Sequence, residues 1–225
     1  MCLPRVPYYV IGYATLKGCI YGLLFWLPTY LEDKHLESQK GYIAAMVDVG
    51  SFIGGLIVGY LGDKYGFRAL FLSPCLFLSS VLMFIVSFTF TDVAWMYYIA
   101  MFVIGLLSGG PYIIIGSAIT IDLGEQAGKA QISKVSALIE GSGALFAAIS
   151  QLIISALPNG GIFYLFSGEC ILGALVLLPL FLKDYHDWKY RWYIKIELIL
   201  NEKKFKQEES KRRGKSRSRI GWNTW

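Results

Sequence analysis

Charged side chains are scarce in this sequence. Asp, Glu, Lys and Arg make up 16% of the 225 residues, whereas soluble domains carry about 25%. Hydrophobic residues reach 55%. An intrinsically disordered chain has the opposite balance, with low hydrophobicity and high charge. Disorder is therefore excluded for most of the chain.

Cysteine and histidine are also sparse. The two histidines, His35 and His186, stand at the ends of apolar segments, where exposure to solvent is the default. The four cysteines are far apart, at Cys2, Cys19, Cys75 and Cys170. This spacing excludes a disulfide scaffold and contains no CxxC or CxxH pair. No Ser-His-Asp arrangement is visible either, so we expect neither an enzyme nor a metal or other cofactor.

Apolar segments of membrane-spanning length are abundant. A helix crosses a bilayer with about 20 apolar residues, and residues 1–182 hold six such segments. Their expected bounds are 7–31, 41–62, 69–90, 95–121, 134–157 and 162–182. Lipid offers no hydrogen-bond partner for open backbone groups, so each segment must be helical. The predicted fold class is all-α, a polytopic membrane protein with six transmembrane helices.

The positions of Lys and Arg predict the orientation. The N-terminus, the second and fourth loops and the C-terminal region lie on one side of the membrane and carry 18 of the 21 basic residues. The opposite side has only Lys34 and Lys40. Positive charge favours the cytosol, so both termini are expected there. The N-terminus also lacks the pattern of a cleavable signal peptide.

Residues 183–225 differ in composition from the rest and are strongly basic. We expect a cytosolic tail without regular structure. Its run from Lys211 to Arg219 is compatible with anionic lipid or nucleic acid, but we interpret it as a solvated segment and expect no nucleic-acid partner. Trp188, Trp192 and Tyr193 suit the membrane interface, which makes membrane lipid an expected partner.

Four ionisable residues lie well inside the predicted helices, where a charge costs about 2.5–3.5 kcal/mol. They are Lys17, Asp48, Glu140 and Glu169. Such residues either line a polar path or form ion pairs that hold helices together, and both interpretations remain open. For Glu169 the second is favoured, because no pattern surrounds it.

Two polar stripes stand out in the first and fifth predicted helices. Tyr13, Lys17 and Tyr21 are four residues apart and share a helical face. A cation flanked by phenol groups suits an anion such as phosphate, although a buried pair with an acid would give the same pattern. The fifth helix has a polar lining, formed by Ser136, Glu140, Gly143, Ala147 and Gln151.

Small residues form faces in the second and fourth predicted helices. The second helix has two GxxxG pairs, Gly50/Gly54 and Gly55/Gly59. Four residues of the fourth helix are expected to share a face: Gly105, Gly109, Tyr112 and Gly116. Gly109-Gly110-Pro111 interrupts the middle of that helix. Close packing explains these glycines, and a bend used in gating is the alternative.

A loop motif between the second and third predicted helices points to a known family. Residues 59–68, GYLGDKYGFR, resemble the GxLaDrxGrk signature of major facilitator transporters. In this motif Gly59 permits close helix approach. Asp63 can accept hydrogen bonds from a helix N-terminus, and Arg68 can pair with acids on moving helices.

Longer matches are similar to the organophosphate:phosphate antiporters and their eukaryotic branch, the sugar phosphate exchangers. They resemble the seventh, eighth, tenth and eleventh helices of that family, in order. The matching segments are YGLLFWLPTYL (21–31), DVGSFIGG (48–55), GLLSGGPY (105–112) with DLG (122–124), and IEGSG (139–143). With their order and spacing, the resemblance extends over residues 8–182.

The resemblance implies an alternating-access antiporter that exchanges a phosphorylated sugar or glycerol phosphate for inorganic phosphate. This chain matches its C-terminal six-helix half, so the N-terminal half is an implied partner, and the endoplasmic reticulum is the implied membrane. The substrate-binding candidates are Lys17, Tyr13, Tyr21, Glu140 and Tyr112. The conformational-switch candidates are Asp48, Gly59, Asp63, Arg68, Gly109, Gly110 and Pro111.

One position departs from the bacterial members of the family. They bind phosphate with an arginine where this chain has Ile20. Lys17 lies one turn earlier and resembles a lysine of the eukaryotic exchangers, so we hypothesise that it replaces the arginine.

Two alternatives remain open. In the first alternative to the antiporter, the chain is part of another major facilitator carrier, such as a proton-coupled sugar or drug transporter in which Asp48 and Glu140 titrate. In the second, it is a non-transporting half-protein that modulates a full-length partner.

Overall fold

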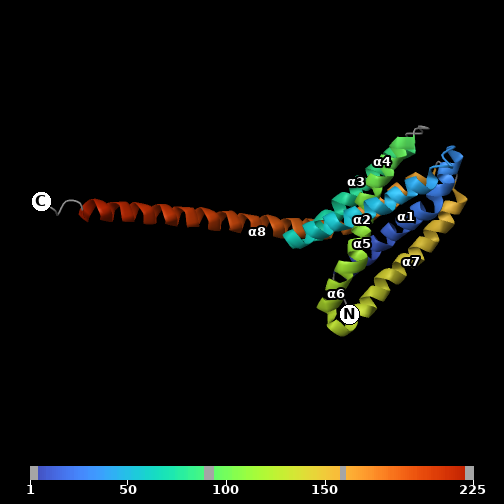
Figure 1. Cartoon of the computed structure of the whole chain (residues 1–225). Helices are drawn as coiled ribbons and strands as arrows, with labels where there is room; N and C mark the ends of the chain where they lie inside the picture. The colour runs from blue at the N-terminus through green and yellow to red at the C-terminus, as the bar shows by residue number, and fades with distance from the viewer. Residues whose placement is uncertain (1–4, 89–93, 158–160, 221–225) are drawn as a thin grey trace. The chain divides into compact units, whose positions relative to one another are not determined.

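The computed structural model describes residues 5–88, 94–157 and 161–220 (Figure 1). In this part of the chain, six helices are long and apolar enough to cross a membrane. They are Val6–Asp33, Lys40–Tyr65, Ala69–Phe88, Ala94–Ala127, Ile132–Ala156 and Ile162–Leu198. The predicted number of six transmembrane helices and the all-α class are therefore confirmed. The end of the predicted span 69–90 and the break at 158–160 lie outside the described residues.

The fourth span is assembled from several pieces. The α-helices are α1 (Val6–Asp33), α2 (Lys40–Tyr65), α3 (Ala69–Phe88), α4 (Ala94–Ile104), α5 (Gly110–Ile114), α6 (Thr120–Ala127), α7 (Ile132–Ala156) and α8 (Ile162–Ile220). Two π-helical turns, Gly105–Gly109 and Ile115–Ile119, join α4 to α5 and α5 to α6. The chain divides into two compact units, residues 1–184 and 185–225.

The first helix, α1, is the most enclosed element of the first unit. In the 18-residue apolar stretch of α1, 61% is buried inside the protein, compared with 33% in that of α2 and 28% in that of α7. It runs beside α7 (Figure 1) and packs on α8 at Gly12 and Gly22, where an added Cβ would press on Leu177 and Phe166. Side chains in the middle of α1 are therefore shielded from the surroundings.

Direct backbone contact joins α2 to the fourth span. A Cβ at Gly50 or Gly54 would lie within 3 Å of the backbone of Phe102 or Leu106, and one at Gly105 would lie within 3 Å of the backbone of Val47. Glycine is the residue that permits this approach. The interpretation of these glycines as packing residues is therefore confirmed.

The expectation that Gly105, Gly109, Tyr112 and Gly116 share one face is wrong. Gly105 and Gly109 face α2, whereas Tyr112 and Gly116 contact Tyr13 of α1. The π-helical turn at Gly105–Gly109 is the physical reason. Its hydrogen bonds run from i to i+5, so the 3.6-residue period does not continue across it.

Side-chain hydroxyls support the irregular fourth span. Ser108 donates a 2.7 Å hydrogen bond to the Ile104 carbonyl oxygen, and Thr120 donates a 2.6 Å bond to the Ile115 carbonyl oxygen. Such bonds supply partners to the backbone where Pro111 or a π-helical turn interrupts the regular pattern.

The second unit is helical where it is described. We expected residues 183–225 to lack regular structure, but α8 continues to Ile220. Beyond Pro179 the described helix has one glycine, Gly214, no further proline, and many Lys, Glu, Arg and Leu residues, all good helix formers. The boundary between the units, at 184/185, lies two residues from the expected one.

Candidate functional site

A buried lysine on α1 is the centre of the candidate site. The Lys17 side chain is 8% exposed, and its Nζ lies 2.5 Å from Oε2 of Glu140 on α7. Nζ also donates a 3.3 Å hydrogen bond to the Glu140 carbonyl oxygen. One turn earlier on α1, Tyr13 Oη donates a 2.5 Å hydrogen bond to Glu140 Oε1. The ion pair compensates two charges that would be costly to bury separately.

Three tyrosine rings surround this pair. Lys17 Nζ lies 5.6 Å from the ring centroid of Tyr13 and 5.7 Å from that of Tyr21, both within cation–π range. Tyr112 of α5 stacks on Tyr13, with centroids 5.2 Å apart and ring planes 9° apart. The structure thus brings together all of the residues that the sequence suggested for substrate binding.

Two glycines leave room for these side chains. A Cβ at Gly143 of α7 would lie 2.7 Å from Lys17 Cδ and 2.9 Å from Tyr13 Cε1. A Cβ at Gly116 would lie 3.0 Å from Tyr13 Oη. We expected Gly143 in the polar lining but did not expect this function of either residue. The signal was present in IEGSG, where Gly143 follows Glu140 by three residues.

The two charged partners differ in exposure. The Glu140 side chain is 43% exposed, compared with 8% for Lys17. A ligand that approaches the site therefore meets the carboxylate before the ammonium group. Access to Lys17 from that side is therefore controlled by the Glu140 side chain.

A second polar contact joins α1 and α7 further along the same helices. Trp26 Nε1 donates a 2.6 Å hydrogen bond to Gln151 Oε1. Gln151 Nε2 is buried and has no hydrogen-bond partner among the described residues. The sequence placed Gln151 in the polar lining, and Trp26 lies in the family-like segment 21–31 but was given no role of its own.

Arg68, one of the predicted switch residues, forms ion pairs with acids on two helices. Its Nη2 lies 2.8 Å from Asp63 Oδ1 in the last turn of α2, and its Nη1 pairs with Asp122 Oδ2 of α6. The predicted pairing of Arg68 with an acid on another helix is therefore observed. We had expected Asp63 to accept hydrogen bonds from a helix N-terminus. In the structure it accepts them from the Arg68 guanidinium group. Gly66, with φ of 72°, ends α2 and turns the chain so that Arg68 reaches back.

The other switch candidates fall into two groups. Gly109 and Gly110 pack against Ser51 and Gly54 of α2, Gly59 lies next to Ile114, and Pro111 is buried in the first turn of α5. These four residues thus belong to the contact between α2 and the fourth span. Asp48 is exposed on α2 and forms no hydrogen bond or ion pair within the described part of the chain.

Glu169 of α8 is buried, with 6% exposure. Ser150 of α7 donates a 2.5 Å hydrogen bond to Glu169 Oε1, and Oε2 has no partner among the described residues. Glu169 therefore joins α8 to α7 by a hydrogen bond to a hydroxyl, whereas an ion pair was the favoured expectation.

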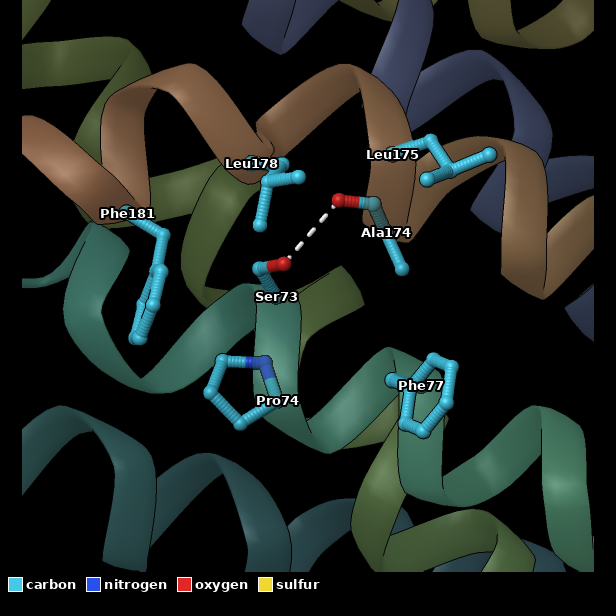
Figure 2. A pocket seen from close by; sticks show the side chains of 7 residues that line it. All are labelled: Ser73, Pro74, Phe77, Ala174, Leu175, Leu178 and Phe181. Carbon is cyan, nitrogen blue, oxygen red and sulfur yellow. Dashed lines mark hydrogen bonds between the residues drawn. The ribbon is translucent and has the colours of Figure 1, made fainter.

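An apolar groove of about 300 Å³ lies between α3 and α8 (Figure 2). It is lined by Ser73, Pro74, Phe77, Ala174, Leu175, Leu178 and Phe181. The Ser73 hydroxyl is already engaged, because it donates a 2.9 Å hydrogen bond to the Ala174 carbonyl oxygen. The groove offers no charged group to an anion and includes none of the Lys17 site residues.

Comparison with known proteins assigns the class. The sequence profile of the Major Facilitator Superfamily matches residues 2–139, more than half of the chain. The chain therefore belongs to the Major Facilitator Superfamily and is a multi-pass membrane protein.

Particular relatives are named exchangers or transporters. Sugar phosphate exchanger 3 of Xenopus laevis is 30% identical over 197 residues, which cover 83% of this chain and 39% of the relative. Glucose-6-phosphate exchanger SLC37A2 of Mus musculus is 30% identical over 196 residues, covering 83% and 39%. Putative glycerol-3-phosphate transporter 1 of Arabidopsis thaliana is 26% identical over 197 residues, covering 81% and 38%. The chain thus spans about two fifths of the length of these relatives.

Proposed function

We propose that this chain is one six-helix half of an antiporter that exchanges a phosphorylated sugar or glycerol phosphate for inorganic phosphate. The names of the relatives support this substrate class. The observation that carries the proposal is the Lys17 ammonium group, buried between tyrosine rings and held by Glu140.

The geometry of Lys17 suggests how exchange proceeds. Without substrate, Glu140 neutralises Lys17, so the cation is never left bare inside the membrane. A phosphate group competes for the ammonium group with strong charge-assisted hydrogen bonds, and the Tyr13 hydroxyl is freed to donate to it. When the ligand leaves, the ion pair forms again. Release of one anion is thus coupled to binding of the next or to recovery of the pair.

Alternating access needs a second half. In major facilitator transporters the substrate lies between two six-helix halves, close to the bilayer midplane. We propose that the N-terminal half is the partner, that it completes the site around Lys17, and that the Arg68 contacts open and close one end. The endoplasmic reticulum membrane, with both termini in the cytosol, is the proposed location.

The test is phosphate exchange by the complete transporter, with this chain as its C-terminal half. An antibody against residues 201–219 identifies the native polypeptide, and a band near 25.2 kDa would show a separate half-protein. The complete protein is reconstituted into liposomes loaded with phosphate, and uptake of labelled phosphate is measured. Lys17→Ala should abolish uptake, whereas Lys134→Ala, which removes an exposed lysine at the start of α7, should preserve it. Normal exchange by Lys17→Ala would refute the proposal.

The exposed Asp48 side chain supports a second candidate function. An exposed acid within the apolar α2 suits a proton-coupled carrier of another solute. Uptake that follows a pH gradient, ignores internal phosphate and is lost in Asp48→Asn would favour that function. Co-purification with a full-length transporter, without transport by this chain, would favour a modulating half-protein.

A further inference from the structure

Three sulfur atoms meet in the core between α1, α3 and α8. They belong to Cys19, Met83 and Cys170, each with 0% exposure. Cys19 Sγ lies 3.7 Å from Cys170 Sγ and 3.9 Å from Met83 Sδ. The third side of the triangle, from Cys170 Sγ to Met83 Sδ, is 4.0 Å. The sulfurs therefore form a nearly equilateral triangle.

The size of this triangle matches metal coordination. A point equidistant from the three sulfurs lies about 2.2 Å from each of them. A bond from a metal ion to a cysteine sulfur is about 2.3 Å long. The three sulfur–sulfur distances therefore match those expected around a three-coordinate ion.

The donor atoms select the kind of ion. Thiolate and thioether sulfur are soft ligands, and a set of cysteine and methionine favours Cu(I). Within the described ranges, no three or more His, Cys, Asp or Glu side chains come together in a group that could hold a metal. A metal ion that needs such ligands therefore has no site in this part of the chain. We propose that Cys19, Met83 and Cys170 bind one Cu(I) ion.

Charge and access are consistent with this site. The thiolate is the form of cysteine that binds metal, so each cysteine ligand releases its proton to water when the ion binds. The charge of Cu(I) offsets one of the two thiolate charges, which lowers the cost of burying them in a membrane protein. The ligands come from three different helices and are fully buried, so the ion enters as the helices assemble. It then ties α1 to α3 and α8.

The experiment measures copper bound by the 225-residue chain, purified in detergent under reducing and anaerobic conditions. Cu(I) is supplied from a buffer of a Cu(I)-specific chelator while the chain is transferred from SDS to a mild detergent, so that the helices assemble in its presence, and copper per chain is determined by mass spectrometry. We expect one Cu(I) per chain, and X-ray absorption should show sulfur neighbours at about 2.2–2.3 Å. The matched control is Cys2→Ala/Cys75→Ala, which leaves Cys19 and Cys170 in place and should bind copper normally.

Substitution of the ligands should weaken binding. Met83→Leu keeps the side-chain size but removes the third sulfur, and we expect a loss of affinity of at least about tenfold, since even outer-shell substitutions cost about 10–100-fold. Cys19→Ala/Cys170→Ala should remove the site. Circular dichroism checks that each variant keeps its helices. The proposal is overturned if the folded wild-type chain binds no copper, or if Cys19→Ala/Cys170→Ala binds as much as the wild type.

Discussion

Lys17 and Glu140 form an ion pair across α1 and α7 in which one partner is enclosed and the other is open. The Lys17 side chain is 8% exposed and that of Glu140 is 43% exposed. The pair joins positions 123 residues apart in the sequence, and Tyr13 holds the second carboxylate oxygen. This asymmetry has consequences for stability that differ between the two residues.

Glu140→Gln should destabilise the chain more than Lys17→Gln. The first substitution leaves an enclosed ammonium group without its counter-charge, and the second leaves a carboxylate that water can reach. Fully buried pairs lose about 3–5 kcal/mol when one partner is removed. Because Glu140 is partly exposed, we expect about 1–3 kcal/mol for Glu140→Gln and less for Lys17→Gln. SDS denaturation monitored by circular dichroism measures the loss of stability in both variants.

The double variant isolates the coupling between these residues. Lys17→Gln/Glu140→Gln should lose less stability than the sum of the single variants, by about 0.5–3 kcal/mol. Glu32→Gln is the control, because its ion pair with Lys40 is exposed and should contribute at most about 1 kcal/mol. Additive single effects would show that the pair is not formed in the membrane protein.

Gly143→Ala should displace the lysine. The new Cβ would lie 2.7 Å from Lys17 Cδ, so the lysine or α7 must shift. Overpacking of this kind costs about 1–3 kcal/mol, and we expect phosphate exchange by the complete transporter to fall with it. Gly141→Ala is the matched control on the same helix, because nothing lies within 4 Å of its added Cβ. If both variants exchange phosphate like the wild type, the space at Gly143 is not needed.

Gly54→Ala should weaken the contact between α2 and the fourth span. Its Cβ would lie within 3 Å of backbone atoms of Leu106, which cannot move aside like a flexible side chain. We expect a loss of about 2–3 kcal/mol in the free energy of unfolding. Gly41→Ala, at an open position of α2, should be neutral or slightly stabilising, because alanine favours helix more than glycine does. Equal stability of the two variants would contradict the close contact.

Arg68→Ala should affect transport more than stability. Its ion pairs with Asp63 and Asp122 include exposed carboxylates, and such pairs contribute about 0–1 kcal/mol. If the contacts hold one conformation of the transporter, their loss changes the exchange rate at nearly constant stability. Exchange assays and SDS denaturation on the same preparation separate the two effects.

A charge reversal tests the Arg68 contact directly. Arg68→Asp/Asp122→Arg should recover part of the exchange rate that Arg68→Asp loses. Lys64→Ala serves as the control, because Lys64 lies over the rings of Tyr60 and Tyr65. A rate reduced as much by Lys64→Ala as by Arg68→Ala would point to general loop charge rather than to these pairs.

The positions of the helices followed from composition, because a bilayer demands long apolar segments and polar breaks. The grouping of Tyr13, Lys17 and Tyr21 followed from four-residue spacing on a regular helix. Both features depend on local sequence and regular geometry, and both are observed where the helices are regular.

Contacts between distant parts of the chain did not follow from the sequence. Three acids were candidates to pair with a buried lysine from the patterns alone, and the packing of α1 on α7 selects Glu140. The division of Gly105 and Gly116 between two faces depends on a π-helical turn that no residue type in the fourth span announces. The Cys19–Met83–Cys170 triangle joins residues 64 to 151 positions apart, so no spacing motif marks it.

The Lys17–Glu140 pair also determines how the membrane potential acts on the proposed transporter. In the unloaded state the two charges cancel, so voltage exerts no net force on this pair as the site changes its side. When an anion replaces Glu140 at Lys17, the site carries the additional charge of that anion, and each elementary charge moved through 100 mV is worth about 2.3 kcal/mol. Through this pair, the membrane potential therefore acts on reorientation of the anion-bound site. It does not act through the pair on reorientation of the empty site.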